Sequence, residues 1–188
     1  MRVVTLLLFL SYTLQACSQE KSSPQINNTV DSTLSPMYNK PSPGKLFLKA
    51  ENAYQEGYYT KAVELCNQII ALDSSYIETF YLRGKAESNL GHHMKAIESF
   101  SIVLEYNPSY NDVYVSRGGV YYDIGNYPAA LEDLSRAIKG NPSDRVAYYN
   151  RGIIYELLNQ MEKACADWQK AADLGHQKAA IEVEKNCK

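Results

Sequence analysis

Residues 114–134 read YVSRGGVYYDIGNYPAALEDL, and the pattern of small and apolar residues in them predicts the fold. A small residue, Gly118, stands twelve positions before Ala130, and Gly125 lies between them. Apolar and small residues on both sides of Gly125 recur at helical spacing. A glycine between two helical patterns suits a left-handed helix cap, where a Cβ would be strained. The stretch therefore predicts two helices joined by a tight turn at Gly125.

The same pattern occurs four times with a period of 34 residues. Pro108 and Pro142 occupy one further position of the pattern, where proline ends the second helix. Several columns that keep one phase over four periods indicate a repeat protein. The columns are the alanines Ala62, Ala96, Ala130 and Ala164; the small residues Ala50, Gly84, Gly118 and Gly152; the turn residues Gly57, Gly91, Gly125 and Asn159; and the larger side chains Cys66, Phe100, Leu134 and Trp168.

This pattern resembles the tetratricopeptide repeat (TPR) family over about residues 43–176, and residues 111–144 match it best. The resemblance implies an all-α, right-handed superhelical solenoid of four helix-turn-helix repeats. The repeats are expected at residues 43–76, 77–110, 111–144 and 145–176. Residues 177–188 are expected to form a C-terminal capping helix, because an uncovered last repeat would expose its apolar face.

The N-terminal segment indicates export. Arg2 precedes a short apolar stretch, which is too short to span a bilayer and is typical of a signal peptide over residues 1–16. Residues 14–17, LQAC, resemble the lipobox of bacterial lipoproteins, which implies that Cys17 carries the lipid. Gln15 departs from that pattern, because the position is usually small. The alternative is an ordinary signal peptide in which the cysteine is accidental.

Residues 17–42 are predicted to form a flexible tether, since they are rich in Ser, Pro and Asn and poor in apolar residues. A short motif at residues 31–33, DST, resembles a bacterial O-glycosylation signal, and the alternative is a plain polar linker. Ser18 follows the lipidated cysteine where some lipoproteins have an aspartate that retains them at the inner membrane. We therefore expect a lipid-anchored protein of the bacterial cell envelope, at the outer membrane in preference to the inner.

Composition and motifs argue against catalysis, nucleic-acid binding and metal binding by this protein. The 188-residue chain has a formal charge of −2 and no block of like charges, which argues against nucleic-acid binding and a polybasic membrane patch. No nucleophile–base set, carboxylate pair or phosphate-binding loop is recognisable. The three histidines, His92, His93 and His176, have no spacing that would bring metal ligands together. The sequence predicts a protein that is not an enzyme and binds no metal or cofactor.

A binding surface follows from the resemblance, because the first helices of TPR proteins line a concave groove. The chain holds 16 tyrosines against 4 phenylalanines, and tyrosine suits half-exposed binding surfaces. We expect a protein or peptide partner, bound by an adaptor or assembly factor of the envelope. Alternatives are a glycan or small-molecule binding module and a structural subunit without a groove ligand. The groove residues implied are Phe47, Tyr54, Tyr81, Lys85, Tyr122, Tyr149 and Ile153.

A column of basic residues stands one position before the column of small residues, which we call the small column. The basic residues are Lys49, Arg83, Arg117 and Arg151. Asp133 and Asp167, on the second helices, could reach an arginine of their own or of the neighbouring repeat. We favour a ladder of structural ion pairs that sets the stacking of the helices, because a partly buried arginine needs a partner. The alternative is an anion-binding ladder.

The remaining cysteines suggest one disulfide. Cys165 stands in the last repeat and Cys187 in the expected capping helix, ten residues before and twelve residues after Gly175. Two helices folded back at Gly175 would bring the cysteines to similar heights, and export allows the bond to form. The alternative is two unpaired thiols, because similar height does not ensure a short Cα separation. Cys66 is expected to be a buried small hydrophobic residue.

Overall fold

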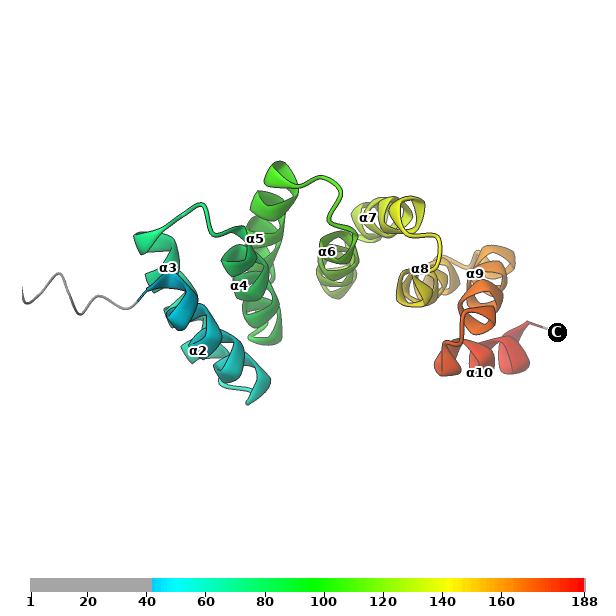
Figure 1. The fold of residues 1–188 in the computed structure, drawn as a ribbon. Helices are drawn as coiled ribbons and strands as arrows, with labels where there is room; N and C mark the ends of the chain where they lie inside the picture. The colour runs from blue at the N-terminus through cyan, green and yellow to red at the C-terminus, as the bar shows by residue number, and fades with distance from the viewer. Residues whose placement is uncertain (1–41, 188) are drawn as a thin grey trace, which may run out of the picture. The chain divides into compact units, whose positions relative to one another are not determined.

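A computed structural model describes residues 42–187 of the chain. Regular structure in this part is entirely helical and consists of nine helices (Figure 1). They are α2 (Pro43–Gln55), α3 (Tyr59–Leu72), α4 (Ile77–Asn89), α5 (His93–Tyr106), α6 (Asn111–Asp123), α7 (Tyr127–Gly140), α8 (Arg145–Leu157), α9 (Met161–Asp173) and α10 (Gln177–Asn186). The predicted signal peptide and residues 17–41 of the predicted tether, Cys17 included, lie outside the described residues.

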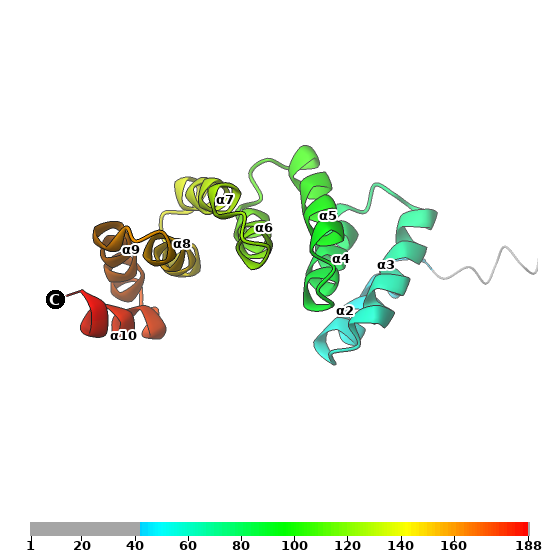
Figure 2. The same ribbon diagram turned by 180° about the vertical axis from the view of Figure 1, so that it is seen from behind.

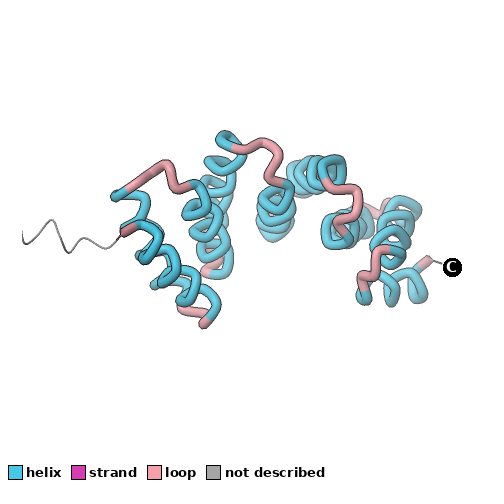
Figure 3. Tube along the Cα trace, viewed as in Figure 1, coloured by secondary structure: helices cyan, strands magenta, loops and turns pink. Residues whose placement is uncertain are grey.

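The helices form a stack of hairpins in chain order. Each first helix packs against the following second helix, in the pairs α2–α3, α4–α5, α6–α7 and α8–α9, and α10 packs against α9. Neighbouring first helices also touch one another, α2 with α4, α4 with α6 and α6 with α8. The view from behind shows the same succession of hairpins (Figure 2), joined only by short loops (Figure 3). The predicted all-α repeat solenoid is confirmed.

The small column lies directly beneath the larger side chains of the second helix. A Cβ on Gly84 would come within 2.6 Å of Phe100, and one on Gly152 within 2.5 Å of Trp168. Phe100 and Trp168 are themselves 1% and 0% exposed. In these two hairpins the helices can therefore approach so closely only because the first one has glycine there. The small and large columns of the sequence are the two sides of one contact.

The turns inside the hairpins use the left-handed backbone conformation. Gly57, Gly91 and Gly125 have φ angles of 83°, 74° and 75°, and Asn159 takes the same place with a φ of 56°. Asparagine is the non-glycine residue that tolerates this conformation best, which explains why the fourth repeat can use it.

The array ends with α10 lying over the last hairpin. Ala179 of α10 is fully buried in a cluster with Ala164, Trp168 and Ala171 of α9. The imidazole Nδ1 of His176 accepts a hydrogen bond from the Ala179 amide at 3.2 Å and so caps the helix. This helix covers apolar surface that the last repeat would otherwise expose to water.

Candidate protein-binding face

The candidate site is the exposed face of α2, α4, α6 and α8, which we call the first-helix face. It carries the seven residues that the resemblance to the TPR family implies. Most of them are half-buried, and Tyr122 is 37% exposed. The face divides into two parts with different chemistry, one on α2 and α4 and the other on α6 and α8.

In the part of the face on α2 and α4, the side chain of Lys85 lies over two aromatic rings. Its Nζ lies 4.7 Å from the ring centroid of Tyr54 and 5.2 Å from that of Tyr81. Asn89, one turn further along α4, donates a hydrogen bond from Nδ2 to the Tyr54 hydroxyl at 3.3 Å. The two rings attract the ammonium group electrostatically and hold it at the surface. Phe47 makes a different aromatic contact, edge-on to Tyr76 with the ring centroids 5.1 Å apart.

Tyr81 is also a structural link between repeats. Its ring packs against Phe100 and Tyr110, with centroid distances of 5.9 and 5.3 Å. Its hydroxyl lies 3.3 Å from Ser116 Oγ on α6, within hydrogen-bond distance. Burial raises the pKa of Tyr81 above its ordinary value, and nearby Asp112 adds to this effect. Tyr81 therefore stabilises the stacking of α4 on α6 as well as facing the surface.

A pocket opens in the part of the face formed by α6 and α8. Its volume is about 230 Å³. It exists because Gly119 has no side chain, and a Cβ added there would meet no atom within 4 Å. We call it the Gly119 pocket, and its walls are Gly118, Gly119, Tyr122, Asp123, Leu134, Asn150, Ile153 and Ile154.

Sequence reasoning did not find this pocket, although it placed Tyr122 and Ile153 on the face. The indication was present in the repeat alignment. The position of Gly119 is filled by Glu51, Lys85 and Ile153 in the other three repeats.

Acidic groups surround the tyrosines of α6 and α8. Tyr149 stacks on His176 with a centroid distance of 4.3 Å. The pKa of Tyr149 is raised, first by burial and then by the negative charges of Glu182 and Glu156. Asp123 adds a further carboxylate at the Gly119 pocket. This part of the face therefore has carboxylates beside its aromatic rings.

Arg117, from the column of basic residues, lines a different depression of the surface. Arg117 donates from Nε and Nη2 to the two carboxylate oxygens of Asp133, at 2.8 and 2.9 Å, and from Nη1 to Ser101 at 2.8 Å. Ser101 belongs to α5 and Asp133 to α7, so one guanidinium connects the second helices of two repeats. The side chains of Arg117 and Asp133 are 18% and 5% exposed, and hydrogen bonds to Asp133 raise the pKa of Arg117.

Arg151 repeats this arrangement in the last repeat. Its Nε and Nη2 donate to Asp167 at 2.7 and 2.8 Å, and its Nη1 donates to Ser135 at 3.1 Å. Hydrogen bonds to Asp167 raise the pKa of Arg151 as well. Each of these two arginines makes three hydrogen bonds within the protein, two of them to one carboxylate, which favours a structural role.

Arg83 differs from the expected ion-pair ladder. Among residues 42–187 it has no acidic partner, because the position equivalent to Asp133 is Ser99. Its Nε donates to Ser99 Oγ at 2.9 Å and its Nη1 donates to Asn67 at 3.2 Å. The second repeat thus keeps the arrangement of the column with neutral acceptors. Sixteen residues separate arginine and acceptor in every one of these three repeats, so this spacing alone would have identified Ser99.

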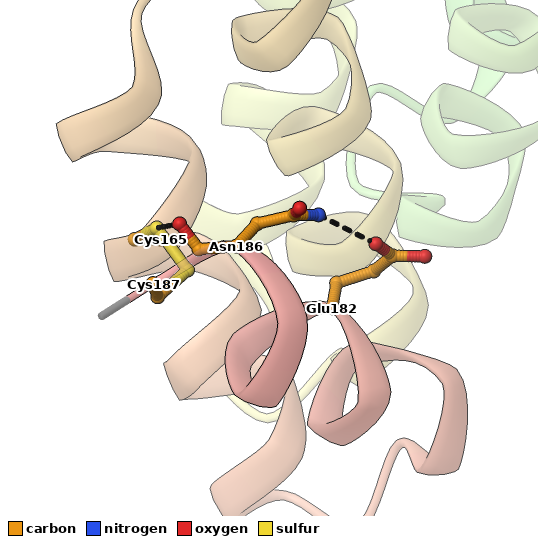
Figure 4. Close-up of a disulfide and its surroundings, with 4 residues drawn as sticks. All are labelled: Cys165, Glu182, Asn186 and Cys187. Atoms are coloured by element: carbon orange, nitrogen blue, oxygen red, sulfur yellow. Dashed lines mark hydrogen bonds between the residues drawn. A yellow bond between two sulfur atoms is a disulfide. The ribbon is translucent and has the colours of Figure 1, made fainter.

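Cys165 and Cys187 are joined by a disulfide, with their Cα atoms 5.5 Å apart (Figure 4). The bond fastens the end of α10 to α9. The Cys165 sulfur also lies 3.9 Å from the Asn186 carbonyl oxygen, which is a contact and not a hydrogen bond, because a disulfide sulfur carries no hydrogen. Cys66 is fully buried, and burial raises the pKa of its thiol to about 12.

Residues 42–187 contain no cluster of three or more His, Cys, Asp or Glu side chains placed to hold a metal ion. Each helix of the same segment is too short or too polar to cross a membrane.

Family profiles match the second half of the array. Residues 118–159 match the TPR repeat and residues 146–174 match the tetratricopeptide repeat. Residues 118–174 therefore match tetratricopeptide repeats. No curated protein matches the sequence.

Solved structures with the same fold cover most of the chain. MamA residues 41 to the end from Desulfovibrio magneticus RS-1 has 25% sequence identity and a TM-score of 0.67, covering 78% of this chain and 94% of that one. Another MamA crystal structure has 24% identity and a TM-score of 0.70, covering 79% and 85%. TTC0263, a thermophilic TPR protein of Thermus thermophilus, has 22% identity and a TM-score of 0.63, covering 71% and 75%. These structures share the TPR solenoid.

Proposed function

We propose that this protein is a lipid-anchored adaptor or assembly factor of the bacterial cell envelope, which binds a polypeptide segment of a partner protein on its first-helix face. Residues 1–16 would be the signal peptide that directs export, and Cys17 would carry the lipid anchor. Both rest on the resemblance of residues 14–17 to a lipobox. Two or more acyl chains hold a protein firmly to a membrane.

One observation carries the binding proposal. The first-helix face presents aromatic rings, a fixed ammonium group at Lys85 and an open pocket at Gly119 along consecutive helices. Aromatic anchors beside a pocket are typical of the residues that dominate binding energy at protein interfaces. The arginine column, by contrast, has its charged groups paired internally in the third and fourth repeats.

A crosslinked pull-down from detergent-solubilised envelope tests this proposal. The comparison is between wild type and the double variant Lys85→Ala/Tyr122→Ala, whose residues reach the surface without the packing role of Tyr81. Tyr58→Ala/Tyr106→Ala is the matched control, because these tyrosines are 64% and 66% exposed and lie outside the predicted face. We expect a partner protein that is lost with the first variant and kept with the control.

Other results would replace parts of the proposal. Equal enrichment by all three proteins would move the binding site away from the first-helix face. Binding that survives protease treatment of the partner fraction would favour a glycan ligand. The anchor is tested separately by metabolic labelling with a radioactive fatty acid, which should label wild type and leave Cys17→Ser unlabelled.

A further inference from the structure

The Gly119 pocket has an apolar floor and a polar rim. Leu134 and Ile154, 0% and 1% exposed, form the floor together with Ile153. Tyr122 and Asp123 are neighbours at the end of α6 and face the same opening. A volume of about 230 Å³ is below the roughly 300–1,000 Å³ of small-molecule sites and suits one side chain.

The charge at the rim selects the kind of side chain. Asp123 is exposed and makes no hydrogen bond or ion pair with any residue between 42 and 187. Glu156 and Glu182 raise the pKa of nearby Tyr149, and Arg145 and Lys178 lower that of His176 stacked on it, so Asp123 is the charged group at the pocket itself. The Lys85 ammonium is held between two tyrosines of the other part of the face. An acidic side chain would be repelled here, whereas a cation would be attracted.

We propose that the Gly119 pocket binds a lysine or arginine side chain of the partner polypeptide. The aliphatic stem lies on Ile153, above the buried Leu134 and Ile154, and the charged end reaches Asp123 beside the Tyr122 ring. Lysine and arginine bury their stems on apolar surface while the charge stays at the rim. A carboxylate and an aromatic face both attract that charge. This inference rests on the proposed function and adds the chemistry of the bound segment.

The pocket can be closed without disturbing the fold. A side chain at Gly119 meets no atom within 4 Å of its Cβ, and leucine favours a helix more than glycine does. Gly119→Leu should therefore unfold at the same temperature as wild type or at a higher one, while it fills the cavity. Gly44→Leu is the matched control, because Gly44 is a second helical glycine with open space around it, at the other end of the array.

The test uses the full chain in detergent micelles and a display library of random twelve-residue peptides. Peptides selected by wild type should share a lysine or arginine at one aligned position. Replacing that cation by norleucine should weaken binding to wild type about tenfold, the combined effect of an exposed ion pair and a cation–π contact. Asp123→Asn should remove most of this difference. Gly119→Leu should abolish selection of the cation and Gly44→Leu should not.

The two proposals fail in different ways. Selected peptides with leucine, methionine or no preference at every position would overturn the cation pocket, and so would binding unchanged by Gly119→Leu. The proposed function would survive either result if Lys85→Ala/Tyr122→Ala still abolished binding. Failure to select any peptide that depends on Lys85 and Tyr122 would overturn both proposals.

Discussion

The first two repeats and the last two have the same helical hairpins but fasten them differently. In the third and fourth repeats, Arg117 and Arg151 form two-oxygen ion pairs with Asp133 and Asp167. In the second repeat, Arg83 reaches the neutral hydroxyl of Ser99. In the first repeat the same two positions hold Lys49, which is exposed, and Leu65, which is buried. The acceptor position, at residues 65, 99, 133 and 167, thus changes from apolar to hydroxyl to carboxylate along the chain.

This gradient shows that the ion pair is not required for the fold. Each repeat keeps the small residue, the alanine and the left-handed turn, and these set the approach of the two helices. The arginines add a second connection, which extends from the first helix of one repeat to the second helix of the preceding repeat. The halves of the array should therefore respond differently to equivalent substitutions, and the following predictions use that difference.

The largest difference is expected from removing the acceptor of the arginine. Asp167→Ala leaves the guanidinium of Arg151, 18% exposed, without its partner and should lower the free energy of unfolding by about 3 kcal/mol. Ser99→Ala removes one neutral acceptor and should cost about 1 kcal/mol. Urea unfolding followed by circular dichroism measures both. Arg151→Met/Asp167→Leu, which removes the whole pair, should recover most of the loss, and equal costs for the two single variants would contradict the comparison.

The disulfide is the second feature that only the C-terminal half has among the described residues. It connects residues 22 apart and fastens α10 over Trp168. Cys165→Ser/Cys187→Ser should lower the free energy of unfolding by about 2–4 kcal/mol, because the unfolded chain gains conformational freedom. Wild type under reducing conditions should show the same loss, while the double variant should be insensitive to the reductant. A variant as stable as oxidised wild type would show that packing alone holds α10.

The small column offers a comparison within each hairpin. A methyl group at Gly152 would lie 2.5 Å from Trp168 Nε1, whereas one at Gly118 would lie 3.1 Å from Leu134 Cγ. Gly152→Ala should cost about 1–3 kcal/mol, because the rigid indole must move. At Gly118 the smaller conflict is offset by the roughly 1 kcal/mol that alanine gains over glycine in a helix. Thermal unfolding should rank the variants in this order, and the opposite order would contradict the packing described for Trp168.

Completing the column in the second repeat should raise stability. Ser99→Asp would give Arg83 the carboxylate that Arg117 and Arg151 already have, with a gain of up to about 1 kcal/mol. The gain should depend only weakly on salt, because a largely buried pair such as Arg117–Asp133 is screened little. Ser99→Asn is the uncharged control of nearly the same size. A loss of stability with both variants would show that the space around the fully buried Ser99 is already filled.

Sequence and structure agree wherever a local pattern decides the conformation. The alanine, small-residue and turn columns predicted the hairpins, including the use of Asn159 in a left-handed turn. They did so because each column reports a contact or dihedral within one repeat. The Gly119 pocket could not be predicted in this way, because its walls come from α6, α7 and α8 and depend on how closely successive repeats approach. That Arg83 has a neutral acceptor in place of an acidic one was recognisable in principle, because Ser99 stands sixteen residues later.

The smallest expected effect is a pH dependence of the cap on α10. Burial lowers the pKa of His176 below its ordinary value near 6.5, and the positive charges of Arg145 and Lys178 lower it further. Native His176 is therefore neutral where the unfolded chain is already protonated. Its contribution to stability is complete above pH 6.5 and is lost as the pH falls from there to the folded-state pKa.

The loss should stay below about 1 kcal/mol, because it concerns one hydrogen bond, from the Ala179 amide to His176 Nδ1. His176→Asn tests this, since asparagine also caps a helix but does not titrate in this range. Unfolding of both proteins between about pH 5 and 7.5 should give curves that diverge below about pH 6.5, with wild type losing more. Parallel curves would show that α10 is held by the buried contact of Ala179 and the disulfide, and that the C-terminal cover of the array is independent of its histidine cap.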